Sequence, residues 1–305
     1  MIFARKSLGV EISPSGVAFA LMGGSARAPR LERVSLCPLS PGTVRFSMKE
    51  ANIIDVKAFA ASLKEAYNKL LYRGTRLSLS LPDTVGRLLL LEVEGRFKSH
   101  NDAIDIIRWK LKKSMPFDIV DSHLDFQQLK IRENGDMVLL VALVSRTVIC
   151  QYEEVFSAAG FAPATINFNI LNLCRTFERH LAGLSDGALV SFYDGIMVII
   201  FFYEGLPEFI RIKDLSGELH NADRLYQEIA SSYLVHRERF PERISQHLIC
   251  IAPPDIDRDF CSSMAEITGA KPVLLMAKSE LALSENVPSD LFPFMAAIGA
   301  ALRSL

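Results

Sequence analysis

The pattern of apolar and polar residues predicts the same three-stranded unit twice in this chain. Within residues 8–38, three short apolar runs are separated by two turns that are rich in Gly, Ser and Pro. Residues 188–212 repeat this arrangement, with turns at 193–195 and 204–205. Apolar runs separated by such residues are typical of strands joined by tight turns. We therefore predict two related antiparallel meanders, one near the start of each half of the chain.

Helical periodicity follows each meander. Apolar residues recur at helical spacing over 57–71, 99–114, 146–159, 168–182, 222–236, 259–268 and 294–303. Further strands are predicted between these helices, at 77–81, 87–93, 123–131, 137–145, 163–166, 248–252 and 273–276. This alternation predicts a mixed α/β protein with a sheet in each half.

A turn-rich segment at residues 184–187 (Leu-Ser-Asp-Gly) is the clearest domain boundary in the sequence. We place a first lobe at residues 1–184 and a second lobe at residues 185–305. A chain of 305 residues is long enough for two substantial hydrophobic cores. Because each lobe begins with a related meander, we expect the lobes to face each other across a cleft.

Composition and charge narrow the classes of partner. Half of the residues are hydrophobic, and 34 basic against 35 acidic side chains leave a formal charge of -1, so no overall field attracts nucleic acid or anionic lipid. Five scattered cysteines without a CxxC motif are typical of a reducing compartment. The longest apolar run, residues 196–203, is too short to cross a membrane, and the N-terminus lacks the apolar core of a signal peptide. We expect a cytoplasmic protein that binds no nucleic acid and does not insert directly into a membrane.

The common catalytic motifs are absent. The sequence contains no dinucleotide fingerprint, P-loop, HExxH or GxSxG motif. Its six histidines do not have the spacing of metal ligands. Three acids within residues 255–259 are most simply a solvated loop, although acids at that place could also meet a metal.

The first turn of each meander carries chemistry that suits phosphate. The first loop offers an acid at the end of its strand, two hydroxyls and a glycine: Glu11, Ser13, Ser15 and Gly16. Backbone N–H groups in such a turn can form an anion site, and Glu11 could hold Mg²⁺ through water. The second loop offers Ser191 and Asp194, but its aromatic residues are bulky, and Asp194 would repel phosphate in the absence of a metal. Two ordinary β-turns are therefore a serious alternative.

Five segments, taken in order along the chain, resemble the actin-like superfamily and, within it, the PilM family of type IV pilus assembly proteins. They are LGVEISPSGV (8–17), SLSLPDTVGRLLLLEVEG (78–95), IRWKLKKSMPFDIVDSHLDFQQL (107–129), ALVSFYDGIMVIIFFYEGLPEFIRI (188–212) and PFMAAIGAALRSL (293–305). The third is the most distinctive, because a helix with a tryptophan ends at an apolar-Pro-Phe step. Together the five segments span most of the chain.

The resemblance implies an α/β, actin-like (ribonuclease H-like) fold of two lobes, with an extra subdomain inserted in the first lobe at about residues 82–162. It implies ATP and Mg²⁺ in the cleft, where Gly217 and Gly299 join the loop residues as candidate cofactor-binding positions. Gly299 lies in a run of small residues, for which close helix–sheet packing is the simpler use. The resemblance also implies a groove, expected between the first meander and the subdomain. This groove would capture the tail of a PilN-like membrane protein and hold the chain at the inner membrane.

Three residues of the helix at 99–114 are candidate contacts for such a partner. Trp109, the only tryptophan, lies off the main apolar stripe, and we expect a second layer of this protein to cover it. Arg108 and Lys112 are four residues apart on one side of the helix, where a solvated charged face is the simpler explanation.

Departures from the family's pattern predict an eroded nucleotide site. Glu11 stands where the family usually has Asp, and residues 191–193 (Ser-Phe-Tyr) replace Asp-Ile-Gly. Asn167 replaces an acid, and Ser216 replaces the first of two glycines. These losses also fit the cytoplasmic domain of GspL and the MshI protein. GspL continues into a membrane span that this sequence does not show, which favours a free PilM-like or MshI-like protein.

Three functions remain open from the sequence. The first is a scaffold of a pilus or type II secretion platform, which binds ATP weakly or not at all, the alternative being an active PilM-type ATPase. The second, an actin-like small-molecule kinase, needs a catalytic acid for which no candidate is convincing. The third, a filament-forming membrane tether of FtsA type, needs a basic amphipathic end, and the last residues carry one charge and no aromatic side chain. Self-association is left open.

Overall fold

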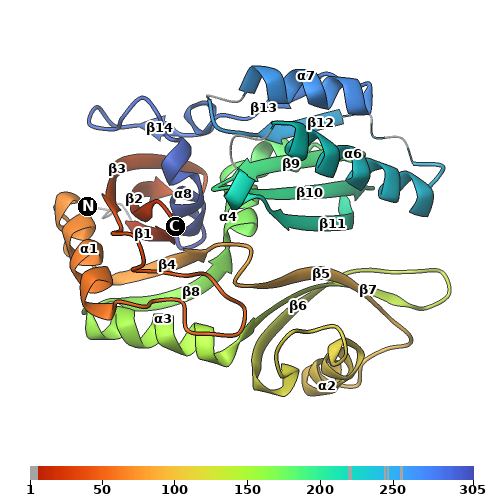
Figure 1. Cartoon of the computed structure of the whole chain (residues 1–305), viewed down its shortest axis with the longest axis horizontal. Helices are drawn as coiled ribbons and strands as arrows, with labels where there is room; N and C mark the ends of the chain where they lie inside the picture. Colours follow the sequence, from red (N-terminus) through yellow and green to blue (C-terminus); the bar gives the residue numbers. More distant parts are fainter. Residues whose placement is uncertain (1–5, 219–221, 244, 246, 255–256) are drawn as a thin grey trace.

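The computed structural model of the chain describes residues 6–218, 222–243, 245, 247–254 and 257–305 (Figure 1). Its strands form three sheets, of six, five and three strands. Among these described residues, no helix is both long and apolar enough to cross a membrane. The architecture is the mixed α/β type that the sequence predicts.

The six-stranded sheet contains the first meander. In spatial order its strands are β14 (Ala282–Leu283), β3 (Ala28–Pro38), β2 (Gly16–Ser25), β1 (Ser7–Ile12), β4 (Arg76–Leu81) and β8 (Ala162–Phe168). β1, β2 and β3 pair antiparallel. β4 pairs parallel with β1, and β8 pairs parallel with β4. All of β1 and most of β2 are buried, which is why both appear in the sequence as nearly continuous apolar runs.

The five-stranded sheet repeats this plan. In spatial order its strands are β11 (Leu206–Asp214), β10 (Ile196–Tyr203), β9 (Gly187–Tyr193), β12 (His247–Ile251) and β13 (Pro272–Leu274). β9, β10 and β11 pair antiparallel. β12 pairs parallel with β9, and β13 pairs parallel with β12. The order and sense match those of β3, β2, β1, β4 and β8, so the two related meanders predicted at 8–38 and 188–212 are confirmed.

The three-stranded sheet forms a subdomain of its own (Figure 1). Its elements are β5 (Gly86–Val93), β7 (Met137–Ser145), β6 (Ser122–Ile131), α2 (His100–Leu111) and the short helix η1 (Ile119–Asp121). On the central strand β7, Leu139 and Val141 pack in the apolar cluster with α2. The alternate residues Leu140 and Ala142 pack against the core of the first lobe. The sheet therefore has one face covered by α2 and one face directed toward the first lobe.

The other helices cover the two larger sheets. They are α1 (Val56–Lys69), α3 (Arg146–Ala158), α4 (Asn169–Thr176), α5 (Glu178–Leu181), α6 (Ala222–Arg239), α7 (Asp257–Thr268) and α8 (Met295–Leu302). α1 begins at Asp55, whose carboxylate accepts a hydrogen bond from the backbone N–H of Ala58 at 2.9 Å. The helix predicted over 168–182 is divided at Phe177 into α4 and α5.

Two elements of the predicted second lobe (185–305) contact the sheet of the first lobe. β14 pairs with β3, and α8 packs on β1, β2 and β4, so the end of the chain returns to the first sheet (blue beside red in Figure 1). This close approach requires a glycine, because a Cβ on Gly9 would collide with the carbonyl of Ala297. α3, which lies within the subdomain predicted at about 82–162, packs on α1 and β8 of the first lobe and also contacts β6 and β7.

The two lobes share apolar contacts. Val190 and Phe192 of β9 pack in a cluster with side chains of α6 and α7. Leu189 and Tyr193, which point to the opposite face, pack in the cluster that contains the first sheet and α8. The turn after β9 is therefore directed at the turn after β1.

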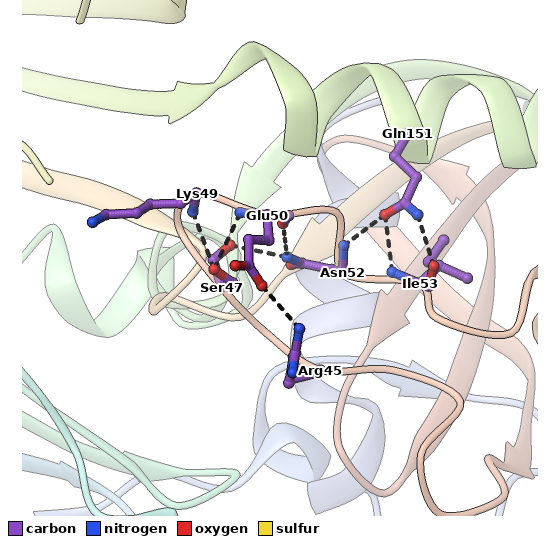
Figure 2. A network of polar contacts seen from close by, with 7 residues as sticks. All are labelled: Arg45, Ser47, Lys49, Glu50, Asn52, Ile53 and Gln151. Atoms are coloured by element: carbon purple, nitrogen blue, oxygen red, sulfur yellow. Dashed lines mark hydrogen bonds and ion pairs between the residues drawn. The ribbon is translucent and has the colours of Figure 1, made fainter. Parts of the chain in front are cut away.

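The long connection between β3 and α1 is held in place by α3 (Figure 2). Gln151 Oε1 accepts hydrogen bonds from the backbone N–H groups of Asn52 (2.6 Å) and Ile53 (2.9 Å), and its amide donates to the carbonyl of Ile53 (2.7 Å). The buried Asn52 donates to the carbonyls of Ser47 and Glu50. These bonds give the loop a defined conformation without regular secondary structure.

Candidate functional site

The turns of the two meanders meet at a buried carboxyl group. Glu11, near the end of β1, is 1% exposed. Tyr193 Oη donates a hydrogen bond to Glu11 Oε2 at 2.9 Å, and Asn169 Nδ2, at the start of α4, donates to Oε1 at 3.3 Å. Both carboxyl oxygens are therefore engaged by side chains of the same chain, one from each lobe. We call Glu11, Ser13, Asn169, Tyr193 and Asp194 the interlobe site.

Asp194 brings a second carboxyl group to this site. It occupies the turn between β9 and β10 with a φ of 51°. Burial raises the pKa of Glu11 well above its ordinary value, and the charge of Asp194 raises it further. Burial raises the pKa of Asp194 to about 6, although its hydrogen bonds to Glu11 and Ser13 lower it. The two carboxyl groups therefore titrate as a coupled pair, and each binds its proton more strongly than an isolated carboxyl group does.

The two hydroxyls of the first loop bond to each other, and Ser13 also bonds to Asp194 of the other lobe. Ser13 Oγ and Ser15 Oγ lie 2.7 Å apart and share a hydrogen bond. Ser13 and Gly16 exchange two backbone hydrogen bonds, at 3.0 and 3.3 Å, which close the turn. A Cβ on Gly16 would collide with the carbonyl of Cys37 in β3, so packing alone requires a glycine here. The backbone N–H groups of Ser13 and Gly16 are thus bonded within the turn.

The remaining candidate cofactor residues do not join the interlobe site as ligands. The buried hydroxyl of Ser191 has no hydrogen-bond partner among the described residues. Gly217 lies in the short helix η2 (Ser216–Glu218), with open space around its Cβ position. A Cβ on Gly299 would collide with the carbonyl of Asn172, so this glycine allows α8 to approach α4.

The structure reveals a polar network that the sequence analysis missed. Ser80 Oγ donates to Asn169 Oδ1 at 2.6 Å and accepts from Asn172 Nδ2 at 2.7 Å. Asn172 Oδ1 accepts from Arg303 Nε at 2.8 Å. With the bond from Asn169 to Glu11, these contacts connect the interlobe site to Arg303. A serine between leucines in β4 and two asparagines on a buried helix are the only local signals of this network.

The described residues contain no group of three or more His, Cys, Asp or Glu side chains that could hold a metal ion. The acidic stretch predicted at 255–259 as a loop that could meet a metal lies outside the side chains that the structure describes.

A pocket of about 440 Å³ lies between the subdomain and the first lobe. We call it the groove. It is lined by Leu81, Leu88, His123, Leu124, Asp125, Phe126, Gln127, Leu140, Ala142, Leu143, Val144, Ile149, Ile166, Asn167, Phe168, Leu171 and Arg303. Its walls include β6 and β8, which are edge strands of their sheets. Its wall in the first lobe is formed by residues of β4, α3, β8 and α4 together with Arg303, at the sheet edge opposite the meander.

The candidate partner residues on α2 do not line the groove. Trp109 is 77% exposed, so the expectation that a second layer covers it is wrong. Arg108 is half-buried and donates a hydrogen bond to the carbonyl of Ser122 at 3.3 Å, whereas Lys112 is exposed. α2 covers the face of the three-stranded sheet opposite to Leu140 and Ala142.

Solved structures share this fold at low sequence identity. A chain of a PilM-PilN type IV pilus biogenesis complex matches with a TM-score of 0.80 and 18% identity, over 97% of this chain and 98% of that chain. The cytoplasmic domain of EpsL, an inner-membrane component of the type II secretion system of Vibrio cholerae, matches with a TM-score of 0.54 and 14% identity, over 99% and 96%. A Bacteroides thetaiotaomicron protein with an actin-like ATPase fold matches with a TM-score of 0.52 and 8% identity, over 91% and 92%.

These comparisons confirm the predicted fold class. The chain has the actin-like fold, and its match to a chain of the PilM-PilN complex extends over nearly its whole length. No protein-family model matches the sequence, and no curated protein matches it. At these identities the likeness is one of fold.

Proposed function

We propose that this chain is a scaffold of a type IV pilus or type II secretion assembly platform, and that it captures the cytoplasmic tail of a PilN-like inner-membrane protein in the groove. The groove itself carries the proposal, because a space with both apolar and polar lining lies there between two edge strands, in a fold shared with a chain of a PilM-PilN complex. Such a role holds the protein at the membrane through its partner.

The groove suits an extended peptide. β6 and β8 each have one edge that pairs with no other strand in the part of the chain described, so their backbone groups can bond to an added strand. Leu140, Ala142 and Ile166 provide an apolar lining for alternate side chains of that strand. Arg303, held by Asn172 and by the carbonyl of Leu171 at 2.8 Å, supplies a fixed positive charge. We therefore expect a tail with alternating apolar residues and an acid near Arg303.

We also propose that the interlobe site has lost its dependence on nucleotide. The carboxyl of Glu11 is already bonded by Tyr193 and Asn169, and Asp194 places negative charge where phosphate would approach. These residues do not fit a Mg-ATP group. The interlobe site then joins the lobes through its own side chains, and the protein acts by binding rather than by hydrolysis.

Tail binding is tested by calorimetry with the purified chain. The probe is a synthetic peptide of the cytoplasmic tail of a single-span membrane protein encoded beside this chain. Ala142→Phe fills the groove and should weaken binding by at least about tenfold. Ala61→Phe, the same change at an exposed position on α1, should leave binding unchanged. Equal affinity of both variants and the unchanged chain would place the tail elsewhere.

Nucleotide binding is tested separately by titration with Mg-ATP. We expect no tight binding, because ATP would have to displace hydrogen bonds that the chain makes internally. Tight binding that is lost in Ser15→Ala would instead support the active ATPase.

A further inference from the structure

The subdomain exposes an aromatic side chain that tail capture does not explain. Trp109 on α2 is 77% exposed, and Val120 on η1, which contacts α2, is 64% exposed. Single exposed apolar residues are common on protein surfaces, so exposure alone indicates little. The surroundings of Trp109 are what distinguish it.

Basic side chains accompany Trp109. Four cations lie within residues 108–113. Lys112 and Lys113 follow Trp109 by three and four positions, at the C-cap of α2 and in the turn after it, and both are exposed. Lys110 is exposed as well, and its ammonium donates to the backbone carbonyl of Glu92 at 2.9 Å. Because this carbonyl is neutral, the bond does not neutralise the charge of Lys110.

The nearby acids offset this charge only in part. Asp121 pairs with Arg146 at 3.1 Å. The carboxylate of Asp118 accepts a hydrogen bond from the backbone N–H of Val120 at the start of η1. Asp105, four positions before Trp109, is one acid on the same side of α2 as the two lysines. Residues 105–121 thus carry four basic and three acidic side chains, and of the acids only Asp121 has an ion pair described here, with Arg146 outside this segment.

We propose that the surface formed by Trp109, Lys112, Lys113 and Val120 lies against an anionic phospholipid bilayer. We call it the Trp109 surface. The proposal rests on the proposed function, because a tail held in the groove brings the chain to a membrane. α2 covers the face of the subdomain opposite the groove-lining residues of β7, so tail and bilayer can be contacted together. Tryptophan prefers the membrane interface, and lysines attract anionic headgroups.

The single tryptophan makes the test direct. Purified chain is titrated with vesicles of phosphatidylcholine, and in parallel with vesicles that also contain phosphatidylglycerol, while the fluorescence of Trp109 is recorded. We expect a blue shift and co-sedimentation with the anionic vesicles only, both reduced by added salt. An unchanged spectrum without co-sedimentation overturns the proposal, as does equal binding to both lipids.

Charge variants give the size of the effect. Each lysine near an anionic surface contributes a factor of about five, so Lys112→Gln with Lys113→Gln should weaken co-sedimentation about 30-fold. Lys57→Gln with Lys64→Gln, at exposed positions of α1, is the matched control and should change it little. Equal losses in both double variants would indicate a general charge effect and contradict a defined surface.

The same variants separate this inference from tail capture. Trp109→Ala should lose vesicle binding and keep the affinity for the tail peptide, since Trp109 does not line the groove. Ala142→Phe should show the opposite behaviour. Loss of tail binding in Trp109→Ala, with folding verified by thermal unfolding, would make this surface part of the protein partner's site and overturn the bilayer contact.

Discussion

The interlobe site and the groove differ in whether their hydrogen-bonding groups have partners within the chain. At the interlobe site, side chains from both lobes bond the carboxyl of Glu11, and α8 packs over the strand that carries it. In the groove, two strand edges and an apolar lining remain without a covering strand in the described part of the chain. A region that the chain completes itself needs no ligand for stability, whereas unpaired strand edges are completed by another chain. We therefore expect recognition at the groove and structural closure between the lobes.

Removal of the Glu11 carboxyl should break the interlobe site and lower the free energy of unfolding strongly. Glu11→Ala leaves the hydroxyl of Tyr193 and the amide of Asn169 without their shared partner in a buried place. We expect the free energy of unfolding to fall by about 3 kcal/mol, measured by urea denaturation. Glu11→Gln, which retains an acceptor, should lose much less. Equal stability of Glu11→Ala and the unchanged chain would show that the site does not hold the lobes together.

The free energy of unfolding should also depend on pH, and the change should be similar in size to the loss in Glu11→Ala. Asp83 is buried and accepts a hydrogen bond from the backbone N–H of Ile170 at 3.0 Å. Burial raises its pKa to about 7. The folded protein therefore binds this proton more strongly than the unfolded one, and its contribution to stability falls as pH rises from about 4 to about 7.

Asp83→Asn keeps an acceptor but does not titrate. Relative to the unchanged chain, this variant should gain stability across the same pH range, by an amount on the order of 4 kcal/mol. Thermal unfolding of both proteins at the two ends of the range measures the difference. Parallel profiles would mean that the pKa of Asp83 is the same in the folded and unfolded states.

Arg303 should give the smallest effect, and it sharpens the comparison because it contacts both regions. It lines the groove and bonds Asn172, which leads through Ser80 and Asn169 to Glu11. Arg303→Ala should weaken tail binding about tenfold, or about 1.4 kcal/mol, in calorimetry. Arg87→Ala, an exposed change on β5, should have no effect. An unaltered tail affinity in Arg303→Ala would remove this residue from the recognition surface.

The fold was predictable where local chemistry decides it. Turn residues and apolar runs near Gly16 and Gly195 define the meanders, and the repetition of the pattern predicts the duplicated sheet. The return of α8 to the first sheet was not predictable in this way, because helical periodicity does not indicate which sheet a helix covers. The collision that a Cβ on Gly9 would make is a contact between residues nearly 300 positions apart.

The candidate site was predictable only in part. Glu11, Ser13 and Asp194, which the sequence places at or just after the ends of two strands, interact with one another in the structure. The bond from Tyr193 depends on how the lobes face each other, and no local pattern encodes that. For Trp109, the helix wheel showed that the side chain lies off the apolar stripe, but it did not show that this side of the helix faces solvent.

The packing of α8 on β1, β2 and β4 has a consequence for biosynthesis. The strands at the start of the chain leave the ribosome long before residues 295–302, and their apolar surface lacks its cover for most of translation. The first lobe can therefore mature only after the second has been made, so a nascent chain that stalls in the second lobe would present that surface to chaperones and proteases.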